Sequence, residues 1–292
     1  MVYLPNARGG VTPDSLFEIY PWMDPIFTDL ERYYDPDYIK IPMDNNPWIP
    51  VFFSILYLLL IGPGQKYMKD KTAWNVPMSV LAGWNFFLAI FSIWGMIRTV
   101  PLWIWYMYNK SIEKQVCDPP HPTWGSGGSG LASQMFCIFK IVELMDTVFL
   151  VVRKKKVIFL HWYHHLTVLL FCWIAYWTEA GMGFYFISMN NTVHAIMYTY
   201  YGFAALKSIP KSYPAYLITS VQILQMVVGI AVVVYTTKLK IYGGETYGPG
   251  ECNNTEFCIG AALIIYGSYL YLFVEFMFNR FVKTKSSDKK VK

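Results

Sequence analysis

Apolar residues gather in seven long stretches along the chain, separated by polar segments. They cover residues 47–62, 76–97, 131–152, 157–177, 184–206, 216–235 and 258–278. A helix needs about 20 residues to cross the hydrocarbon core of a bilayer, and six stretches reach that length. The first is shorter, but its flanking residues can extend it. The runs are continuous and do not alternate in polarity, which favours helices over barrel strands. The pattern predicts an all-α, polytopic membrane protein with a bundle of seven transmembrane helices; the alternative is a soluble protein with seven buried helices.

Composition supports the membrane interpretation. The chain has 292 residues, of which 55% are hydrophobic and only 15% charged, whereas a soluble domain carries roughly 25% charged residues. The seven stretches contain only four charged residues, namely Lys140, Glu143, Asp146 and Glu275. Three regions follow: an acidic N-terminal segment (1–46), a membrane domain (47–282) and a basic tail (283–292).

The distribution of Lys and Arg predicts the orientation of the chain. Seven spans place the termini on opposite sides; the side that holds the C-terminus carries 15 Lys and Arg, and the other side carries 8. By the positive-inside rule, the C-terminus is cytosolic and the N-terminus lumenal. The chain begins without the pattern of a cleaved signal peptide. Lys289 and Lys290 resemble a dilysine retrieval signal of the endoplasmic reticulum; the alternative is a solvated basic tail.

Two predicted lumenal loops contain candidate modification sites. Asn109 and Asn253 each begin a glycosylation sequon. Cys117, Cys252 and Cys258 lie in the same loops, where a disulfide can form, so Cys117 is expected to pair with Cys252 or Cys258. Cys137 and Cys172, within spans, are expected to be small packing residues.

Polar residues inside the predicted spans are the candidates for function, because ionisable groups in a membrane are costly. They form four groups on four spans: Lys140, Glu143, Asp146 and Thr147; His161, His164 and His165; Asn191, His194, Met197, Tyr198 and Tyr201; and Thr219, Gln222 and Gln225. Within each group, helical spacing puts the residues on one face. At 1.5 Å per residue, all four groups fall in the cytosolic half of the membrane. The sequence therefore predicts a polar chamber that is open to the cytosol and closed by an apolar lumenal half. For the first group, the alternative is a structural ion pair.

The histidine triplet has two chemical interpretations. Membrane di-iron oxidases also use clustered histidines, but this chain has five in all, and His121 lies in a loop. Four imidazoles are too few for a di-iron site, so no metal is expected, although a single-metal site stays open. The second interpretation is nucleophilic and acid–base catalysis by imidazole, which titrates near neutral pH. A histidine can attack a thioester and hold the acyl group as an acyl-imidazole, which a dry chamber protects from water.

Four motifs in order make the chain resemble the ELO family of very-long-chain fatty acid elongases. They are Lys140-x-x-Glu143-x-x-Asp146-Thr147, His161-x-x-His164-His165, Asn191-x-x-His194-x-x-Met197-Tyr198-x-Tyr200-Tyr201 and Thr219-x-x-Gln222-x-x-Gln225. The resemblance implies a narrow acyl tunnel within the bundle and condensation of an acyl-CoA with malonyl-CoA to 3-ketoacyl-CoA, carbon dioxide and CoA. It implies no cofactor.

The resemblance also implies roles for individual residues. His164 would take the acyl chain and His194 would face it, while His161, His165 and Asp146 would orient or deprotonate the nucleophile. The remaining polar residues would bind the thioester and malonyl groups: Lys140, Glu143, Thr147, Asn191, Tyr198, Tyr201, Gln222 and Gln225. The basic loop of Arg153, Lys154, Lys155 and Lys156 suits CoA phosphates; alternatively, it only sets the topology.

Substrate and partners are expectations of the same resemblance. Trp162 and Tyr163, inside the histidine motif, resemble members that act on saturated and monounsaturated chains. A polyunsaturated acyl-CoA is the alternative substrate, and a metal-dependent lipid oxidase or a transporter is the alternative class. Expected partners are the ketoacyl-CoA reductase, dehydratase and enoyl reductase of an elongation cycle, and a homodimer is allowed. No nucleic acid is expected to bind.

Overall fold

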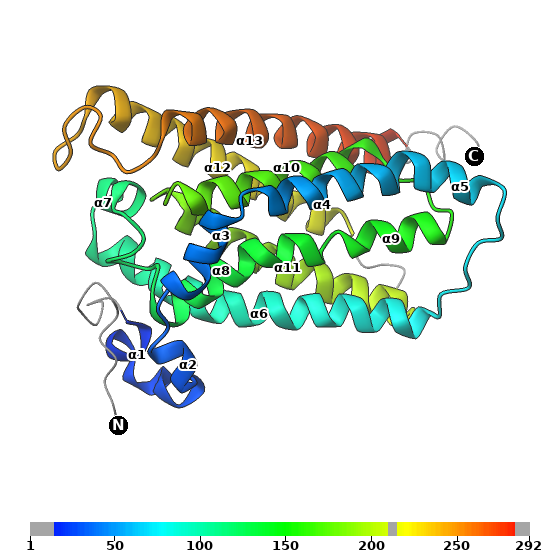
Figure 1. Cartoon of the computed structure of the whole chain (residues 1–292), viewed down its shortest axis with the longest axis horizontal. Helices are drawn as coiled ribbons and strands as arrows, with labels where there is room; N and C mark the ends of the chain where they lie inside the picture. The colour runs from blue at the N-terminus through cyan, green and yellow to red at the C-terminus, as the bar shows by residue number, and fades with distance from the viewer. Residues whose placement is uncertain (1–14, 210–214, 284–292) are drawn as a thin grey trace.

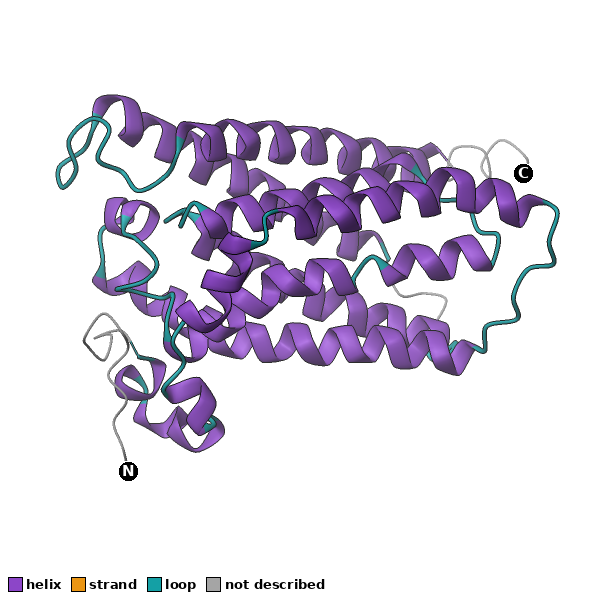
Figure 2. Ribbon diagram, viewed as in Figure 1, coloured by secondary structure: helices purple, strands orange, loops and turns teal. Residues whose placement is uncertain are grey.

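The computed structural model describes residues 15–209 and 215–283, and every regular element in these two ranges is helical (Figures 1 and 2). The bundle consists of α4 (Trp48–Leu59) with α5 (Gln65–Lys69), α6 (Met78–Asn109), α8 (Gly127–Val142) with α9 (Met145–Val152), α10 (Phe159–Trp177), α11 (Gly183–Ala205), α12 (Tyr216–Tyr242) and α13 (Glu256–Met277).

In the part of the chain that the structure describes, four helical segments are long and apolar enough to cross a membrane: Trp48–Lys69, Met78–Asn109, Tyr216–Tyr242 and Glu256–Phe281. Their outward faces carry large apolar side chains; Ile90 is 67% exposed and Ile264 is 68% exposed. An apolar surface of this kind requires a covering, and around long apolar helices lipid provides it. The protein is therefore a multi-pass helical membrane protein. The other three predicted spans correspond to α8 with α9, α10 and α11, the helices that carry most of the polar groups.

The two ends of the bundle differ in chemistry (Figure 1). One end, here called the basic end, contains α5, the end of α9 and the end of α13. Its described basic residues are Lys66, Lys69, Lys71, Arg153, Lys154, Lys155, Lys156, Lys207 and Arg280. The other, here called the disulfide end, contains α7 (Ile112–Cys117) and the loop between α12 and α13. The proposed retrieval pair, Lys289 and Lys290, lies outside the described residues.

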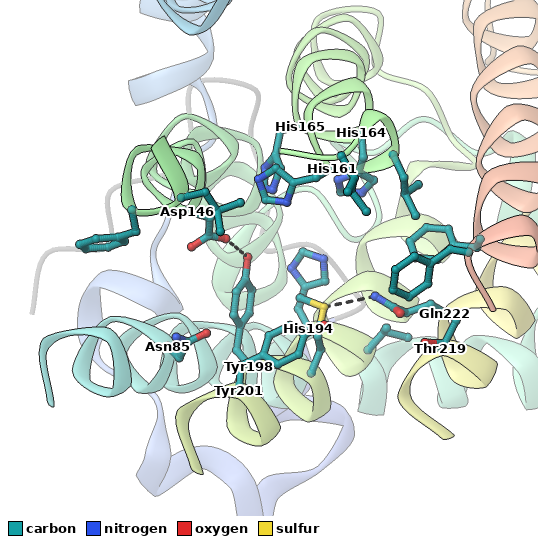
Figure 3. Close-up of a pocket in the computed structure, with 18 of the residues that line it drawn as sticks. Asn85, Asp146, His161, His164, His165, His194, Tyr198, Tyr201, Thr219 and Gln222 are labelled. Carbon is teal, nitrogen blue, oxygen red and sulfur yellow. Dashed lines mark hydrogen bonds between the residues drawn. The ribbon is translucent and has the colours of Figure 1, made fainter. Parts of the chain in front are cut away.

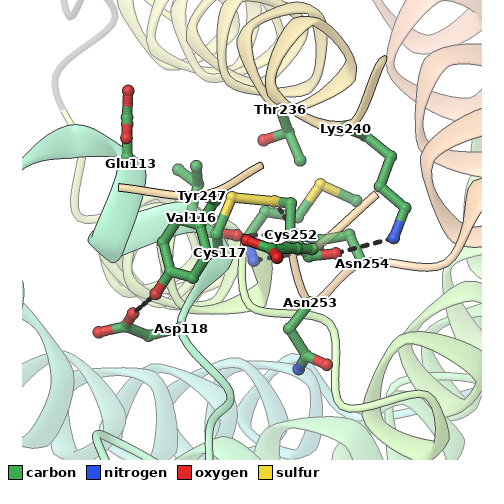
Figure 4. The surroundings of a disulfide bond; sticks show 12 residues. Glu113, Val116, Cys117, Asp118, Thr236, Lys240, Tyr247, Cys252, Asn253 and Asn254 are labelled. Atoms are coloured by element: carbon green, nitrogen blue, oxygen red, sulfur yellow. Dashed lines mark hydrogen bonds between the residues drawn. A yellow bond between two sulfur atoms is a disulfide. The ribbon is translucent and has the colours of Figure 1, made fainter. Parts of the chain in front are cut away.

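A disulfide joins Cys117 to Cys252 and ties α7 to the α12–α13 loop (Figure 4). Cys258 is a buried free thiol. The Asn253 backbone N–H donates to the Cys117 carbonyl at 3.1 Å, and its side-chain amide donates to the Glu179 carbonyl at 2.7 Å. Asn109, in contrast, is exposed at the last residue of α6. The two sequons thus differ in accessibility.

The N-terminal segment packs on the disulfide end through four short helices: α1 (Leu16–Ile19), η1 (Pro21–Ile26), α2 (Asp29–Arg32) and α3 (Asp37–Asn45). Its anchor is Glu31, whose carboxylate accepts a 2.7 Å hydrogen bond from Arg98 and a 3.1 Å hydrogen bond from Trp94 on α6. Glu31 and Arg98 are only 3% and 6% exposed. Burial alone would raise the pKa of Glu31, but the hydrogen bonds from Arg98 and Thr28 and the guanidinium charge hold it below its usual value.

Two departures from straight helices shape the bundle. Leu60–Gly64 forms a π-helical turn around Pro63, which lacks an N–H to continue the α-helical ladder. The third predicted span is broken between α8 and α9, at Glu143 and Leu144. Elsewhere α6 and α11 pack closely because Gly95 has no side chain: a Cβ there would lie 2.7 Å from the Asn191 side-chain nitrogen.

Candidate active site

A cavity of about 540 Å³ lies among the helices and runs inward from the basic end. Met78 and Arg153 line it near that end, and Asn190, Gln225 and Met226 line it further into the bundle. Figure 3 shows the histidines of α10 on one side and His194 with Tyr198 on the other. Eleven of the expected polar residues line this histidine cavity: Asp146, Arg153, His161, His164, His165, His194, Tyr198, Tyr201, Thr219, Gln222 and Gln225. The predicted polar chamber in one half of the bundle therefore exists.

Besides Lys154, Lys155 and Lys156 of the basic loop, four buried residues expected to bind substrate do not line the cavity: Lys140, Glu143, Thr147 and Asn191. They are 1%, 4%, 0% and 2% exposed. The arc that these residues occupy on their helices is wider than the strip of each helix that faces the cavity. Their side chains instead support the residues in front of them.

Lys140 and Glu143 form a buried ion pair behind His194. Lys140 Nζ donates to Glu143 Oε1 at 2.6 Å, and His194 Nδ1 lies 3.6 Å from the same oxygen. A carboxylate beside Nδ1 favours the tautomer with the proton on that nitrogen. Nε2 of His194 is then the basic nitrogen, on the opposite edge of the ring.

Asp146 is held between two aromatic side chains. The Trp84 indole N–H donates to Oδ1 at 2.6 Å, and the Tyr198 hydroxyl donates to Oδ2 at 2.9 Å. The Tyr198 ring also packs edge-on against His194, with centroids 5.3 Å apart. Asp146 was expected to orient a histidine, but its hydrogen-bond partners are Trp84 and Tyr198. Trp84 was not anticipated, because a lone tryptophan in an apolar helix carries no periodic signal.

His161 takes part in a chain of hydroxyl groups. Its Nε2 lies 2.8 Å from Thr147 Oγ1, which in turn lies 2.8 Å from the Tyr57 hydroxyl on α4. Tyr57 was also absent from the predicted site, since α4 has no polar stripe. The only sequence signal available was general: a buried tyrosine hydroxyl usually has a partner.

The ring of His164 makes no hydrogen bond to any residue within 15–209 or 215–283, unlike that of His161, which bonds to Thr147. The His164 ring packs against that of Tyr269, with centroids 5.0 Å apart, and Tyr269 donates to the His164 backbone carbonyl at 3.1 Å. His165 is buried, and its Nδ1 has no hydrogen-bond partner there. His164 is thus fixed through its backbone while its ring nitrogens stay available in the cavity.

Below Gln225 and Met226, the bundle is packed. A Cβ at Gly229, the next turn of α12, would lie 2.2 Å from the Tyr266 ring. Tyr266 also packs on Phe186 of α11, with ring centroids 4.7 Å apart. The Gly229–Tyr266 contact, which brings α12 against α13, therefore forms the floor beneath the cavity.

The four residues of the basic loop have different contacts. Arg153 lines the cavity. Lys154 donates to the backbone carbonyls of Lys69 and Lys71 at 2.8 and 3.1 Å, so it holds the α5–α6 loop. Lys155 and Lys156 are exposed at the basic end. Of the four expected phosphate ligands, Lys154 is therefore occupied with backbone contacts.

A metal site requires ligand atoms that lie close together. Among the described residues, the cavity histidines do not form such a set. Within 15–209 and 215–283, one set converges, with all its ligand atoms within 4.8 Å of one another: Asp35, Asp37 and His121. It belongs to the N-terminal segment and the α7–α8 loop, at the disulfide end.

The chain is similar to known proteins over most of its length. A family model described as ELO, the GNS1/SUR4 family, matches residues 42–289. "Fatty acid elongase 2" of Trypanosoma brucei brucei is 38% identical over 257 residues, covering 86% of this chain and 94% of the relative. "Putative fatty acid elongase 3" of Caenorhabditis elegans is 34% identical, covering 91% of this chain and 81% of the relative. "Very long chain fatty acid elongase 3" of Homo sapiens is 32% identical, covering 89% and 95%.

Proposed function

Because this chain belongs to the ELO family of fatty acid elongases, we propose that it condenses a long-chain acyl-CoA with malonyl-CoA. The products are 3-ketoacyl-CoA, carbon dioxide and free CoA. The observation that carries this proposal is the free imidazole of His164 in a cavity that also contains the Glu143-oriented His194. No cofactor is required, since both substrates arrive as activated thioesters.

In the first half-reaction, an unprotonated ring nitrogen of His164 attacks the thioester carbonyl carbon. The N–C bond forms, the C–S bond breaks, and CoA leaves as a thiolate that takes up the proton released from His164. His194 Nε2 is suited to carry that proton, because Nδ1 is committed to Glu143. The acyl-imidazole then waits in a cavity largely walled by protein, where water has little access.

In the second half-reaction, malonyl-CoA loses carbon dioxide and leaves an enolate. The enolate carbon attacks the acyl-imidazole carbonyl, a C–C bond forms and the C–N bond breaks. His164 leaves this step as an imidazolate and takes up one proton from water, because its first proton left with CoA. Gln222 and Gln225 line the cavity, and their side-chain amides can donate hydrogen bonds to the carbonyl and malonyl oxygens. The hydroxyl proton of Tyr198 is already donated to Asp146.

We place the acyl chain between the histidines and the Gly229–Tyr266 floor, and CoA at the basic end. Arg153 lines the cavity at that end, and a guanidinium binds phosphate oxygens through paired N–H donors. Saturated or monounsaturated chains are the proposed substrates, on the similarity of Trp162 and Tyr163 to members with that preference. Polyunsaturated acyl-CoA is the alternative.

We further propose that all seven helical segments cross the membrane of the endoplasmic reticulum, with the disulfide end lumenal and the basic end cytosolic. This orientation places the disulfide in the lumen and the cavity mouth towards cytosolic CoA esters. Asn109 is the better glycosylation site of the two, because it is exposed whereas Asn253 is half-buried. The reductases and dehydratase of an elongation cycle would consume the product.

The test is a single-turnover assay on purified protein in nanodiscs. Palmitoyl-CoA alone should release CoA and add the palmitoyl mass to the peptide that contains His164; adding malonyl-CoA should then yield the 3-keto product. His164→Ala should lose both steps while keeping its thermal midpoint. Product formation by that variant refutes the nucleophile. Transport of acyl-CoA without malonyl-CoA consumption would indicate a transporter, and stoichiometric iron would indicate an oxidase.

A further inference from the structure

Three hydroxyl and imidazole groups from three helices form a connected chain at one wall of the histidine cavity. Tyr57 comes from α4, Thr147 from α9 and His161 from α10. Both links measure 2.8 Å. Tyr57 and Thr147 are 2% and 0% exposed, so no bulk water competes for their hydroxyl groups.

Counting protons fixes the direction of this chain. Each hydroxyl has one proton, and leaving a buried proton without an acceptor is costly. Within the described residues, the Tyr57 hydroxyl bonds only to Thr147, so Tyr57 donates. Thr147 must then direct its own proton to its other neighbour, Nε2 of His161. If His161 donated to Thr147 and Thr147 donated to Tyr57, the Tyr57 proton would have no acceptor. If Tyr57 and His161 both donated to Thr147, the Thr147 proton would have no acceptor.

The direction of the chain determines the state of His161. Because Nε2 accepts, a neutral His161 carries its proton on Nδ1, at the other edge of the ring. His161 lines the cavity. We propose that Tyr57 and Thr147 are positioning residues that hold His161 as the neutral Nδ1–H tautomer, a hydrogen-bond donor for the oxyanion that forms on the substrate thioester.

This inference rests on the proposed condensation but has consequences of its own. As a donor, His161 transfers no proton; it stabilises the tetrahedral intermediate and stays neutral. Thr147, which the sequence assigned to substrate binding, acts through His161 instead. Through Tyr57, α4 also contributes to the site, although this helix buries only Pro50, Ser54 and Tyr57.

The first experiment measures protection of His161 and needs no substrate. Diethyl pyrocarbonate modifies the unprotonated imidazole nitrogen, which in His161 is the one covered by Thr147. In nanodiscs, His161 should therefore react severalfold more slowly than His164, as measured by peptide mass spectrometry. Thr147→Val should speed His161 modification, and Thr147→Ser should keep it slow. Equal rates at His161 in wild type and Thr147→Val overturn the proposal, whether or not the protein is an elongase.

The second experiment uses the kinetics of condensation. Tyr57→Phe and Thr147→Val should lower kcat about tenfold to a hundredfold, the usual effect of removing a partner that orients a site histidine. KM for acyl-CoA should change little, and Thr147→Ser should restore kcat. The matched control is Tyr34→Phe, which removes another buried tyrosine hydroxyl, one without a hydrogen-bond partner in the described chain. If the wild type is active and both Tyr57→Phe and Thr147→Val have the wild-type kcat, the positioning role of Tyr57 and Thr147 is refuted and the condensation is not. If the wild type is inactive, the condensation alone is refuted.

Discussion

His194 Nδ1 lies 3.6 Å from Oε1 of Glu143, so a buried carboxylate on the α8 terminus faces a cavity histidine on α11. Glu143→Gln should lower kcat about a hundredfold or more, because an amide no longer selects the Nδ1–H tautomer or stabilises the imidazolium; removing the corresponding carboxylate of a catalytic triad costs roughly 10⁴. Single-turnover kinetics should show the loss in the step that transfers the acyl chain, with KM nearly unchanged.

Glu143→Gln also leaves Lys140 without its 2.6 Å partner, and a buried unpaired charge is destabilising. The double variant Lys140→Met/Glu143→Gln removes both charges and separates the two effects. If it regains the thermal midpoint but not kcat, Glu143 acts on His194. Recovery of kcat in the double variant would contradict the orienting role.

Arg153 and Lys154 are adjacent cations with different contacts, which makes them a matched pair. Arg153→Gln should raise KM for acyl-CoA and malonyl-CoA about tenfold, the equivalent of one charge-assisted hydrogen bond to a phosphate. Lys154→Gln should leave KM unchanged and lower the thermal midpoint, because it loses its bonds to the Lys69 and Lys71 carbonyls. The reverse pattern would place CoA on Lys154.

The course of α6 shows where the sequence pattern reaches its limit. The apolar stretch ends at residue 97 because Arg98 follows, yet α6 continues to Asn109. Arginine is a good helix former, so the charge does not end the helix. The bundle accommodates it because Glu31 pairs with it at 2.7 Å, across 67 residues of sequence. No local pattern reveals a partner at that distance. The four long apolar helices, in contrast, were foreseeable from hydropathy alone.

The candidate site, like the fold, could be predicted from the sequence only in part. Helical spacing brought the histidines, Tyr198 and Gln222 to one cavity, since i, i+3 and i+4 positions share a face. Spacing could not separate cavity contacts from the layer behind them, so Thr147 and Asn191 were assigned to substrate. Nor could it find Tyr57 and Trp84, whose roles depend on hydrogen bonds between helices.

Acidification should loosen the N-terminal segment. The folded-state pKa of Glu31 lies below its ordinary value of 4.5, so the stability its carboxylate contributes is present above about pH 4.5 and is lost as pH falls through the folded-state pKa. Glu31→Gln should cost about 3 kcal/mol at neutral pH, since it leaves Arg98 buried and unpaired. The difference in thermal midpoint between wild type and variant should shrink as the pH falls below 4.5.

Asp29→Asn is the control for Glu31, because Asp29 is 78% exposed and pairs with Arg32 at the surface. It should change the thermal midpoint little at any pH. A difference between wild type and Glu31→Gln that does not depend on pH would contradict the assigned role of the carboxylate.

The floor of the cavity should limit the length of the product. Tyr266 fills the space above Gly229 and packs on Phe186, one turn deeper than Met226. Tyr266→Ala should open room for about two to four more methylenes and shift products towards longer chains, because truncating a buried aromatic side chain leaves a cavity. Gas chromatography of products from an acyl-CoA series measures the shift. Tyr271→Ala, on the same helix but 68% exposed, is the matched control and should leave the profile unchanged. An unaltered profile in Tyr266→Ala, with the protein folded and active, would mean that the acyl chain ends elsewhere.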